Sequence, residues 1–380
     1  MRGVHDMDKP IRVLHVLGGL DAGGAESFIM NIYRSIDKSQ IQFDFIKHLS
    51  SEGIFEDEIR SLGGRIYICL PFNGKNYFTY CKWWQEFFSQ HPEYHVIHSH
   101  VRSTASIYLP IAKKHGLTTI VHSHSTSNGS GITAIVKNLL QLSLRKIADY
   151  LFSCSDIAGS WLFGKRALDR PNYRMIPNSI DLERFTFNEQ IRRDVRQRLG
   201  LQENDLVIGH IGRFSEPKNH PFLIRVFQEI RKKNKRAQLL LIGGGQKQAE
   251  IEELVSQQGL SACVHFLGIQ KRPELFYQAM DVFLFPSLWE GLPVGVVEAQ
   301  ASGLPCVVSD VITKQVCLTD LVFSVSLRSS AEEWADVVLR CVRPQRCGLN
   351  AGQRLALSGF DSRTVAAELT KFYLEIGKHE

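Results

Sequence analysis

The chain has 380 residues, more than one hydrophobic core usually serves, so its length predicts two domains and excludes a single small binding module. Hydrophobic residues make up 44%, charged residues 22% and aromatic residues 10%, a balance that excludes disordered and fibrous proteins. No apolar run reaches the roughly 18 residues of a membrane span, and the first residues lack the apolar stretch of a secretory signal, so we expect a cytoplasmic protein.

The net charge is +6, from 45 basic and 39 acidic residues, which is too mild to indicate nucleic-acid binding. The segment from Lys82 to Arg174 contains eleven Lys and Arg residues but five Asp and Glu residues, and this excess of six equals the net charge of the whole chain. This basic segment suits phosphates or an anionic membrane surface, although a solvated helical face explains it equally well. The eight cysteines form no Cys-x-x-Cys pair, which favours reduced thiols over disulfides or zinc.

Short apolar segments alternate with helical ones in the first half of the chain. Residues 11–17 predict a buried strand, and residues 25–36 predict a helix because Phe28, Ile29, Ile32 and Ile36 recur at helical spacing. Further strands are predicted at residues 42–47, 65–69, 95–98, 118–122, 150–153 and 173–176. Strands that alternate with helices at this pitch indicate βαβ units and a parallel sheet.

The pattern restarts after a turn-rich linker at residues 176–185. Strands are predicted at residues 206–211, 238–242, 264–266, 281–285, 306–309 and 321–324, with helices such as residues 221–232 between them. We therefore predict an α/β protein of two doubly wound, Rossmann-like domains. The predicted division is a tail at residues 1–10, a first domain at 11–185, a second domain at 186–360 and a final segment at 361–380.

Ligands of such sheets bind beyond the carboxyl ends of the strands, so we expect an interdomain cleft lined by both halves. Gly23 and Gly24 end a glycine-rich turn between a strand and a helix, where backbone amides can approach an anion. A purely structural turn is an equally good interpretation. The turn is not Gly-x-Gly-x-x-Gly, and the next strand ends in Lys47 rather than an acidic residue, which disfavours a dinucleotide-binding dehydrogenase.

Two cations follow the first strand of the second half. Arg213 stands at the strand's carboxyl end, and Lys218 lies five residues later, just before a helix. Cations beside helix-start amides suit a diphosphate, although exposed loop residues are as probable from this motif alone. Glu290 and Glu298 are eight residues apart, so if the loop runs into a helix both carboxylates can lie on one side of it and bind sugar hydroxyls. A carboxylate that only stabilises a helix start is the simpler alternative.

Histidines gather at two predicted strand ends of the first half, at His95, His98, His100, His122 and His124. Four of them have the spacing to converge on a metal, but no Asp or Glu lies beside them, so a contact with a phosphoryl group or a sugar hydroxyl fits better than zinc. The only Asp-x-Asp, Asp6-Met-Asp8, precedes the first strand. Because Mg²⁺ needs carboxylates, the sequence predicts a leaving-group site without metal or other cofactor.

Together these motifs resemble the retaining GT-B glycosyltransferases of family 4, most closely the branch that builds bacterial exopolysaccharide and capsule units. The resemblance extends from about residue 11 to 373 and includes the stretch Glu298-Ala-Gln-Ala-Ser-Gly-Leu-Pro-Cys306. It implies transfer of a hexose or N-acetylhexosamine from a UDP-sugar to a glycan or polyprenyl-diphosphate-linked acceptor.

The resemblance also implies residue roles. Gly23 and Gly24 would face the diphosphate and acceptor, Arg213 and Lys218 would bind the diphosphate, and Glu298 would bind the ribose. Glu290 and the amides of Gly291, Leu292, Pro293 and Val294 would hold the donor sugar, and Leu267 would contact the base. His124 matches the active-site histidine, with His122 as the alternative. The helix at residues 362–373 resembles the GT-B tail that crosses back to the first domain.

Two aromatic or amphipathic segments, residues 77–88 and 132–146, lie in or beside the basic segment. They suit peripheral docking on anionic lipid at the inner membrane face, although helix faces buried on the sheet are the commoner explanation. Two other functions on the same architecture stay open at this point. They are a non-hydrolysing nucleotide-sugar epimerase and a non-catalytic nucleotide-sugar-binding partner.

Overall fold

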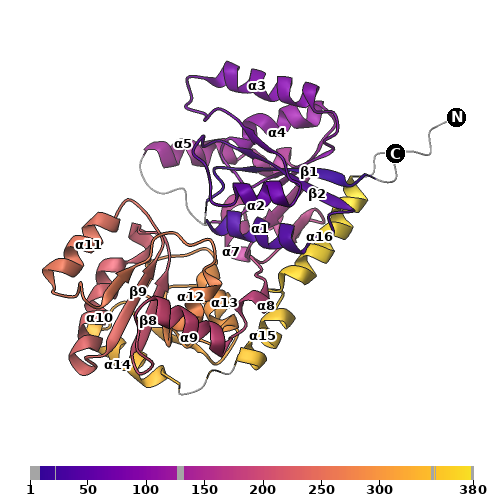
Figure 1. Cartoon of the computed structure of the whole chain (residues 1–380). Coiled ribbons are helices and arrows are strands. Elements are labelled where there is room, and N and C mark those ends of the chain that lie inside the picture. The colour runs from indigo at the N-terminus through magenta and orange to yellow at the C-terminus, as the bar shows by residue number, and fades with distance from the viewer. Residues whose placement is uncertain (1–8, 22, 126–131, 344–345, 347, 378–380) are drawn as a thin grey trace. The chain divides into compact units, whose positions relative to one another are not determined.

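The computed structural model describes residues 9–21, 23–125, 132–343, 346 and 348–377, which form two compact units (Figure 1). Unit 1 comprises residues 1–179 and 362–380, and unit 2 comprises residues 180–361. The division lies between Ser179 and Ile180, so α8 (Leu182–Phe185), which the sequence assigns to the first domain, is part of unit 2. There α8 contacts α12 (Glu274–Ala279) and α13 (Val294–Ala301).

Unit 1 is built on a seven-stranded sheet with the order β3-β2-β1-β4-β5-β6-β7, in which every pairing is parallel. Its strands are β1 (Ile11–Leu17), β2 (Ile41–Lys47), β3 (Ile66–Ile68), β4 (Val96–Ser99), β5 (Thr118–Ser123), β6 (Tyr150–Ser153) and β7 (Tyr173–Met175). Its helices are α1 (Gly24–Ser35), α2 (Glu56–Ser61), α3 (Tyr77–Gln90), α4 (Ala105–Lys114), α5 (Ile132–Gln141), α6 (Leu144–Ile147), α7 (Asp156–Phe163) and α16 (Ser362–Ile376), with a 3₁₀ turn at Lys165–Ala167.

Both faces of this sheet are buried, because successive residues of β1 point to opposite sides. Leu14 and Val16 belong to a core with residues of α3 and α4, whereas Val13 and Leu17 belong to a core with residues of α1 and α16. The final helix α16 therefore completes unit 1, where it lies beside α1 and contacts β1 and β2 (Figure 1).

Unit 2 repeats the design with a six-stranded parallel sheet in the order β10-β9-β8-β11-β12-β13. Its strands are β8 (Leu206–Ile211), β9 (Ala237–Ile242), β10 (Val264–Phe266), β11 (Val282–Phe285), β12 (Cys306–Ser309) and β13 (Val322–Val325). Besides α8, α12 and α13, its helices are α9 (Glu189–Arg198), α10 (His220–Lys233), α11 (Gln248–Gln257), α14 (Ala331–Cys341) and α15 (Gly348–Leu357), with 3₁₀ turns at Glu216–Lys218 and Lys314–Val316.

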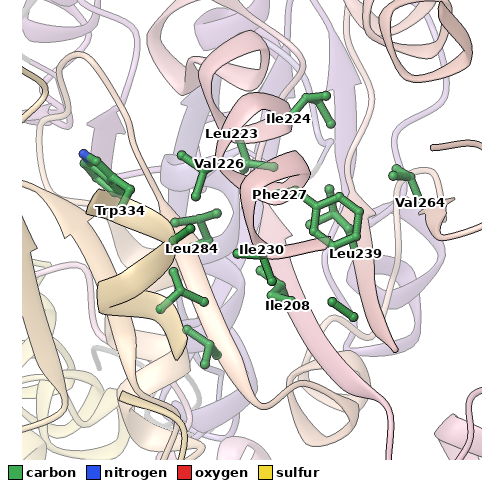
Figure 2. Packing of buried hydrophobic residues seen from close by; sticks show 14 of the residues in the cluster. Ile208, Leu223, Ile224, Val226, Phe227, Ile230, Leu239, Val264, Leu284 and Trp334 are labelled. Atoms are coloured by element: carbon green, nitrogen blue, oxygen red, sulfur yellow. The ribbon is translucent and has the colours of Figure 1, made fainter. Parts of the chain in front are cut away.

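The core of unit 2 shows why α10 forms where it does. Leu223, Val226, Phe227 and Ile230 recur at helical spacing, and all four are buried against the sheet residues Ile208, Leu239 and Leu284 and against Trp334 of α14 (Figure 2). The predicted pair of Rossmann-like α/β domains is thus confirmed.

Candidate functional site

In the sheet of unit 2, β9 and β10 lie on one side of β8, and β11, β12 and β13 lie on the other. The strand order therefore reverses between the neighbours β8 and β11, which is the kind of position at which open α/β sheets bind ligands. The loops that follow these two strands are joined by hydrogen bonds. The Asn219 side-chain amide donates to the carbonyl of Pro286 at 3.1 Å, and the Leu288 amide donates to the carbonyl of Pro217 at 2.8 Å. Residues that follow β8 and residues that follow β11 therefore form one continuous surface.

Lys218 and Glu290 meet on this surface, one from each loop. The Lys218 ammonium lies 2.8 Å from a Glu290 carboxylate oxygen and 4.5 Å from the ring centroid of Phe285. Their side chains are only 19% and 14% exposed. The sequence identified both residues but did not pair them. Because the ion pair is only partly hydrated, a bound anion would compete with Glu290 for the ammonium.

Arg213 is the second residue after β8 and is exposed. Its loop is fixed by the neighbouring strand, since the Gly212 amide donates to the carbonyl of Ile242 at 2.9 Å. Gly243 has φ +140°, and a Cβ there would lie 2.1 Å from the Gly212 carbonyl oxygen, so only glycine permits this approach. Within the described chain no carboxylate is paired with Arg213, which leaves its charge available to an anion at the carboxyl edge.

Glu298 lies inside α13, whereas Glu290 lies in the loop before it, because the helix begins at Val294. The loop thus runs into a helix, which was the condition of the expectation, and of the two carboxylates only Glu298 belongs to the helix itself. Gly291, Leu292 and Pro293 form the approach to the helix N-terminus, where the Val296 amide donates to the Pro293 carbonyl at 3.0 Å. Leu292 and Pro293 are buried, and Gly291 and Val294 are half-buried.

The Glu298 carboxyl is buried, and burial is the main reason that its pKa rises to about 7. The Tyr277 hydroxyl lies 2.8 Å from its Oε2 and donates to it, which partly offsets the effect of burial on the pKa. Leu267 follows β10, and its amide donates to the Leu241 carbonyl at 2.9 Å. It lies at the same edge of the sheet as Arg213, but β9 separates its strand from β8.

In unit 1, Gly23 caps α1 and Gly24 begins it, in the turn that follows the interior strand β1. Gly24 is exposed, and a Cβ there would meet nothing within 4 Å. At Gly23 the nearest atoms to a Cβ would be those of the flexible Glu26 carboxylate, the closest at 2.1 Å. Gly24 is therefore the open position at this helix start, whereas the Glu26 carboxylate lies against Gly23.

His124 and His122 differ sharply in exposure. His122 lies inside β5 and is fully buried, whereas His124 follows the strand and is half-buried. The His124 ring lies between two partners, with Nδ1 3.2 Å from Asn178 Oδ1 and Nε2 2.8 Å from His100 Nδ1. Burial lowers the pKa of His124 to about 4, so the ring is neutral at pH 7. His124 is therefore the histidine of this pair that a substrate can reach.

The His124 contacts belong to a network of side chains that also includes His15, His98 and His122. Two of its members, His15 and Asn178, were not predicted from the sequence, and one predicted histidine, His95, is absent from it. His15, in the middle of β1, joins because the parallel register places it opposite His98, and Asn178 lies in the segment predicted to be a linker. His95, in contrast, precedes β4 and lies at the amino end of that strand, away from the others. Only the order and register of the strands distinguish these positions.

Comparison with known proteins identifies the class of enzyme. Residues 22–184 match the sequence profile of Glycosyltransferase Family 4, and residues 191–342 match that of Glycosyl transferases group 1. The chain is a glycosyltransferase, as the resemblance implied. It is 37% identical over 372 residues to EpsF of Bacillus subtilis, a glycosyltransferase by name, covering 95% of this chain and 96% of EpsF, and it belongs to the same family.

Two further similarities support the assignment. A galactosyltransferase of Escherichia coli, named for transfer from UDP-Gal to α-D-GlcNAc-diphosphoundecaprenol, is 26% identical over 231 residues, 58% of each chain. The crystal structure of HepE from Anabaena, in complex with UDP and glucose, superposes with a TM-score of 0.77 at 18% identity and covers 96% of this chain and all of HepE. The structural likeness confirms the GT-B fold.

Proposed function

We propose that this glycosyltransferase moves a hexose or N-acetylhexosamine from a UDP-sugar to a hydroxyl of a glycan or polyprenyl-diphosphate-linked acceptor in bacterial polysaccharide synthesis. The observation that carries the proposal is the cationic pair Arg213 and Lys218 at the strand-order reversal of unit 2, where a diphosphate would lie. The donor named for the Escherichia coli relative and the UDP bound to HepE support the choice of uridine.

The remaining residues of unit 2 suit a nucleotide sugar. Glu298, when ionised, would accept hydrogen bonds from the ribose hydroxyls, and Leu267 would contact the base. Glu290 and the backbone from Gly291 to Val294 would hold the sugar. Gly23 and Gly24 of unit 1 would face the diphosphate and the acceptor.

We infer retention of configuration by front-face substitution. The bond between the anomeric carbon and the phosphate oxygen breaks, the acceptor oxygen bonds to the same face of that carbon, and the acceptor proton passes to the departing phosphate oxygen. Negative charge grows on the diphosphate as this bond breaks, so Arg213 and Lys218 would stabilise the transition state more than the ground state. These two cations would supply the charge that a metal provides in other enzymes. His124 would contact the sugar or acceptor as a neutral hydrogen-bonding group.

The test is a screen of nucleotide sugars by thermal unfolding, followed by product analysis with a lipid-linked acceptor and excess EDTA. A donor at 100 times its Kd should stabilise the folded protein by about 2.7 kcal/mol. We expect a UDP-sugar to stabilise the protein and an α-linked product to form with EDTA present. Stabilisation by no UDP-sugar, or an inverted product, would refute the proposed donor or mechanism respectively.

We also propose peripheral docking on an anionic membrane through α5. None of the described helices is long and apolar enough to span a membrane. In α3 the large aromatic residues Tyr80, Trp84 and Phe87 are buried, so most of that predicted docking surface belongs to the core. In and just after α5, in contrast, Ile135, Val136, Leu139 and Leu142 are 50–64% exposed, and the exposed Lys137, Arg145 and Lys146 lie nearby.

Such an arrangement is typical of helices that lie in the membrane interface. Vesicles with anionic lipid should bind the wild-type protein more tightly at low salt than at high salt. Replacing Ile135 and Leu139 together by Ser should weaken binding roughly tenfold or more. The matched control is Leu357→Ser, which removes a 90% exposed leucine from unit 2 and should change nothing. Equal binding by all three proteins would exclude docking through α5.

A further inference from the structure

Five imidazoles gather at the carboxyl edge of the unit 1 sheet, from β1, β4, β5 and the residues that follow them. They are His15, His98, His100, His122 and His124. Two sets of three have nitrogen atoms within 4.8 Å of one another, namely His15 with His98 and His100, and His100 with His122 and His124. Among the described residues, the groups of three side chains placed to hold a metal ion are these two.

The outer set is the one a metal can reach. His15 and His98 are fully buried, whereas His124 is half-buried at the end of its strand. In the outer set, the nitrogens His100 Nδ1 and His124 Nε2 are 2.8 Å apart, and the rings of His122 and His124 stack with centroids 4.0 Å apart. His122 Nε2 is buried and has no hydrogen-bond partner within the described chain.

Each member of the outer set has its second nitrogen beside an atom that can accept a hydrogen bond, either the Asn178 oxygen or the nitrogen of another imidazole whose proton is on its other nitrogen. His124 Nδ1 lies 3.2 Å from Asn178 Oδ1, and His122 Nδ1 lies 3.3 Å from His98 Nε2. His100 Nε2 lies 3.1 Å from His15 Nδ1. If these second nitrogens carry the protons, His124 Nε2, His100 Nδ1 and His122 Nε2 all present lone pairs, and the two that lie 2.8 Å apart would repel each other unless a cation bound both. Metal-binding histidines are oriented by the same kind of contact at the nitrogen that does not touch the metal.

We propose that His100, His122 and His124 bind one divalent transition-metal ion of the zinc class, with an open fourth position toward solvent. Three imidazole nitrogens suit zinc, nickel or copper, whereas magnesium and calcium require oxygen ligands. Zinc bonds of about 2.0–2.1 Å place the ligand nitrogens of a tetrahedral site roughly 3.3 Å apart, so rings whose nitrogens lie within 4.8 Å of one another would move to bind the ion. The three rings are also neutral at pH 7, because burial lowers the pKa of each one.

A bound ion would engage the lone pair of His124 and so block the histidine that we place beside the substrate. Zinc should therefore inhibit sugar transfer, and EDTA should reverse the inhibition. This consequence rests on the proposed function, whereas binding of the ion does not. Inhibition and binding are accordingly measured in separate experiments.

The binding experiment is equilibrium dialysis of the whole chain against ZnCl₂ alone, with MgCl₂ as comparison and Co²⁺ as a spectroscopic probe. We expect one Zn²⁺ per chain, no Mg²⁺, and the visible absorption bands of four-coordinate Co²⁺. Loss of a partner that only orients a metal ligand weakens metal binding by roughly 10-fold to 100-fold, and Asn178→Ala should have an effect of this size. His122→Gln and His100→Gln each remove a ligand and should weaken Zn²⁺ binding by roughly 100-fold or more. His115→Gln removes an exposed histidine of the same unit and should leave the affinity unchanged.

Absence of Zn²⁺ binding by the wild-type protein, or equal binding by His122→Gln, His100→Gln and the control, would overturn the proposed site. Thermal unfolding establishes that each variant is folded. If the cluster variants do not fold, X-ray absorption of the Zn²⁺-loaded wild-type protein decides. Three imidazole ligands at about 2.0–2.1 Å support the site, and a spectrum without histidine scattering refutes it. Zinc that binds without inhibiting an active transferase would refute only the assignment of His124 to the substrate site.

Discussion

The carboxyl edges of the two sheets occupy equivalent positions in the same kind of fold, yet they carry opposite chemistry. In unit 1 the edge is a network of neutral imidazoles linked to one another and to Asn178. In unit 2 it is charged, with Lys218 paired to Glu290 and Arg213 exposed. A parallel sheet therefore fixes where ligands bind, while the residues that follow its strands decide whether the site offers charge or neutral hydrogen-bonding groups.

The largest expected difference between the two edges is their response to acid. Burial lowers the pKa of all five histidines of the unit 1 network and of the half-buried His48, whereas the described part of unit 2 has three histidines with lowered pKa values, the buried His210 and His220 and the half-buried His265. Below pH 6.5 the unfolded chain binds protons that these folded rings do not, so the free energy of unfolding falls as pH falls. Each such ring contributes up to about 1.4 kcal/mol per pH unit.

We expect the free energy of unfolding of unit 1, measured by denaturant unfolding, to fall by on the order of 5 kcal/mol as the pH falls from 7.5 to 5.5. Amide hydrogen exchange at pH 5.5 should show β1 and β4 losing more protection than β8 and β11. His15→Gln should reduce the pH dependence by about one proton, whereas the exposed His115→Gln should not change it. A stability of unit 1 that is constant over this range would contradict a neutral network.

The second prediction concerns the charged edge. Lys218→Ala or Arg213→Ala should lower turnover by about 100-fold or more, the scale on which loss of one donor to a developing negative charge acts. Lys232→Ala is the control, because it removes a lysine that forms an ion pair with Glu229 at 2.7 Å on the exposed face of α10. Steady-state kinetics with a saturating donor measure the effect. Wild-type turnover in Lys218→Ala would show that Lys218 does not stabilise the transition state.

Much of this arrangement is predictable from sequence, because apolar runs bounded by glycines and polar turns define all thirteen strands of the two sheets. Arg213 and Lys218 are also identifiable, since a strand ends just before them. The contact between Lys218 and Glu290 is not, because it depends on β8 and β11 being neighbours, and β9 and β10 separate them in the chain. The place of His15 in the histidine network is not predictable either, because a pattern of alternating strands and helices does not identify β4 as the strand that lies beside β1.

The third prediction tests the titration of Glu298, whose pKa burial raises to about 7. If the ionised carboxylate binds the ribose, affinity for UDP-sugars should rise about tenfold between pH 6 and pH 8, as the ionised fraction grows from about one tenth to nine tenths. Glu298→Gln should bind the donor more weakly and without this pH dependence. Calorimetric titration at several pH values makes the measurement. An unchanged pH profile in Glu298→Gln would exclude Glu298 as the titrating group.

The smallest expected effect lies away from either edge and tests whether unit 2 has its own stability. Ser330 caps α14, the helix that contributes Trp334 to the core, because its hydroxyl accepts from the Glu333 amide at 3.2 Å while the Glu333 carboxylate accepts from the Ser330 amide at 2.7 Å. Ser330→Ala should lower the free energy of unfolding by about 1 kcal/mol. The adjacent Ser329→Ala is the control and should have no comparable effect. Because the cap stabilises only unit 2, hydrogen exchange should accelerate in β8 and α10 but not in β1 and α1, and equal acceleration in both units would show that they unfold together.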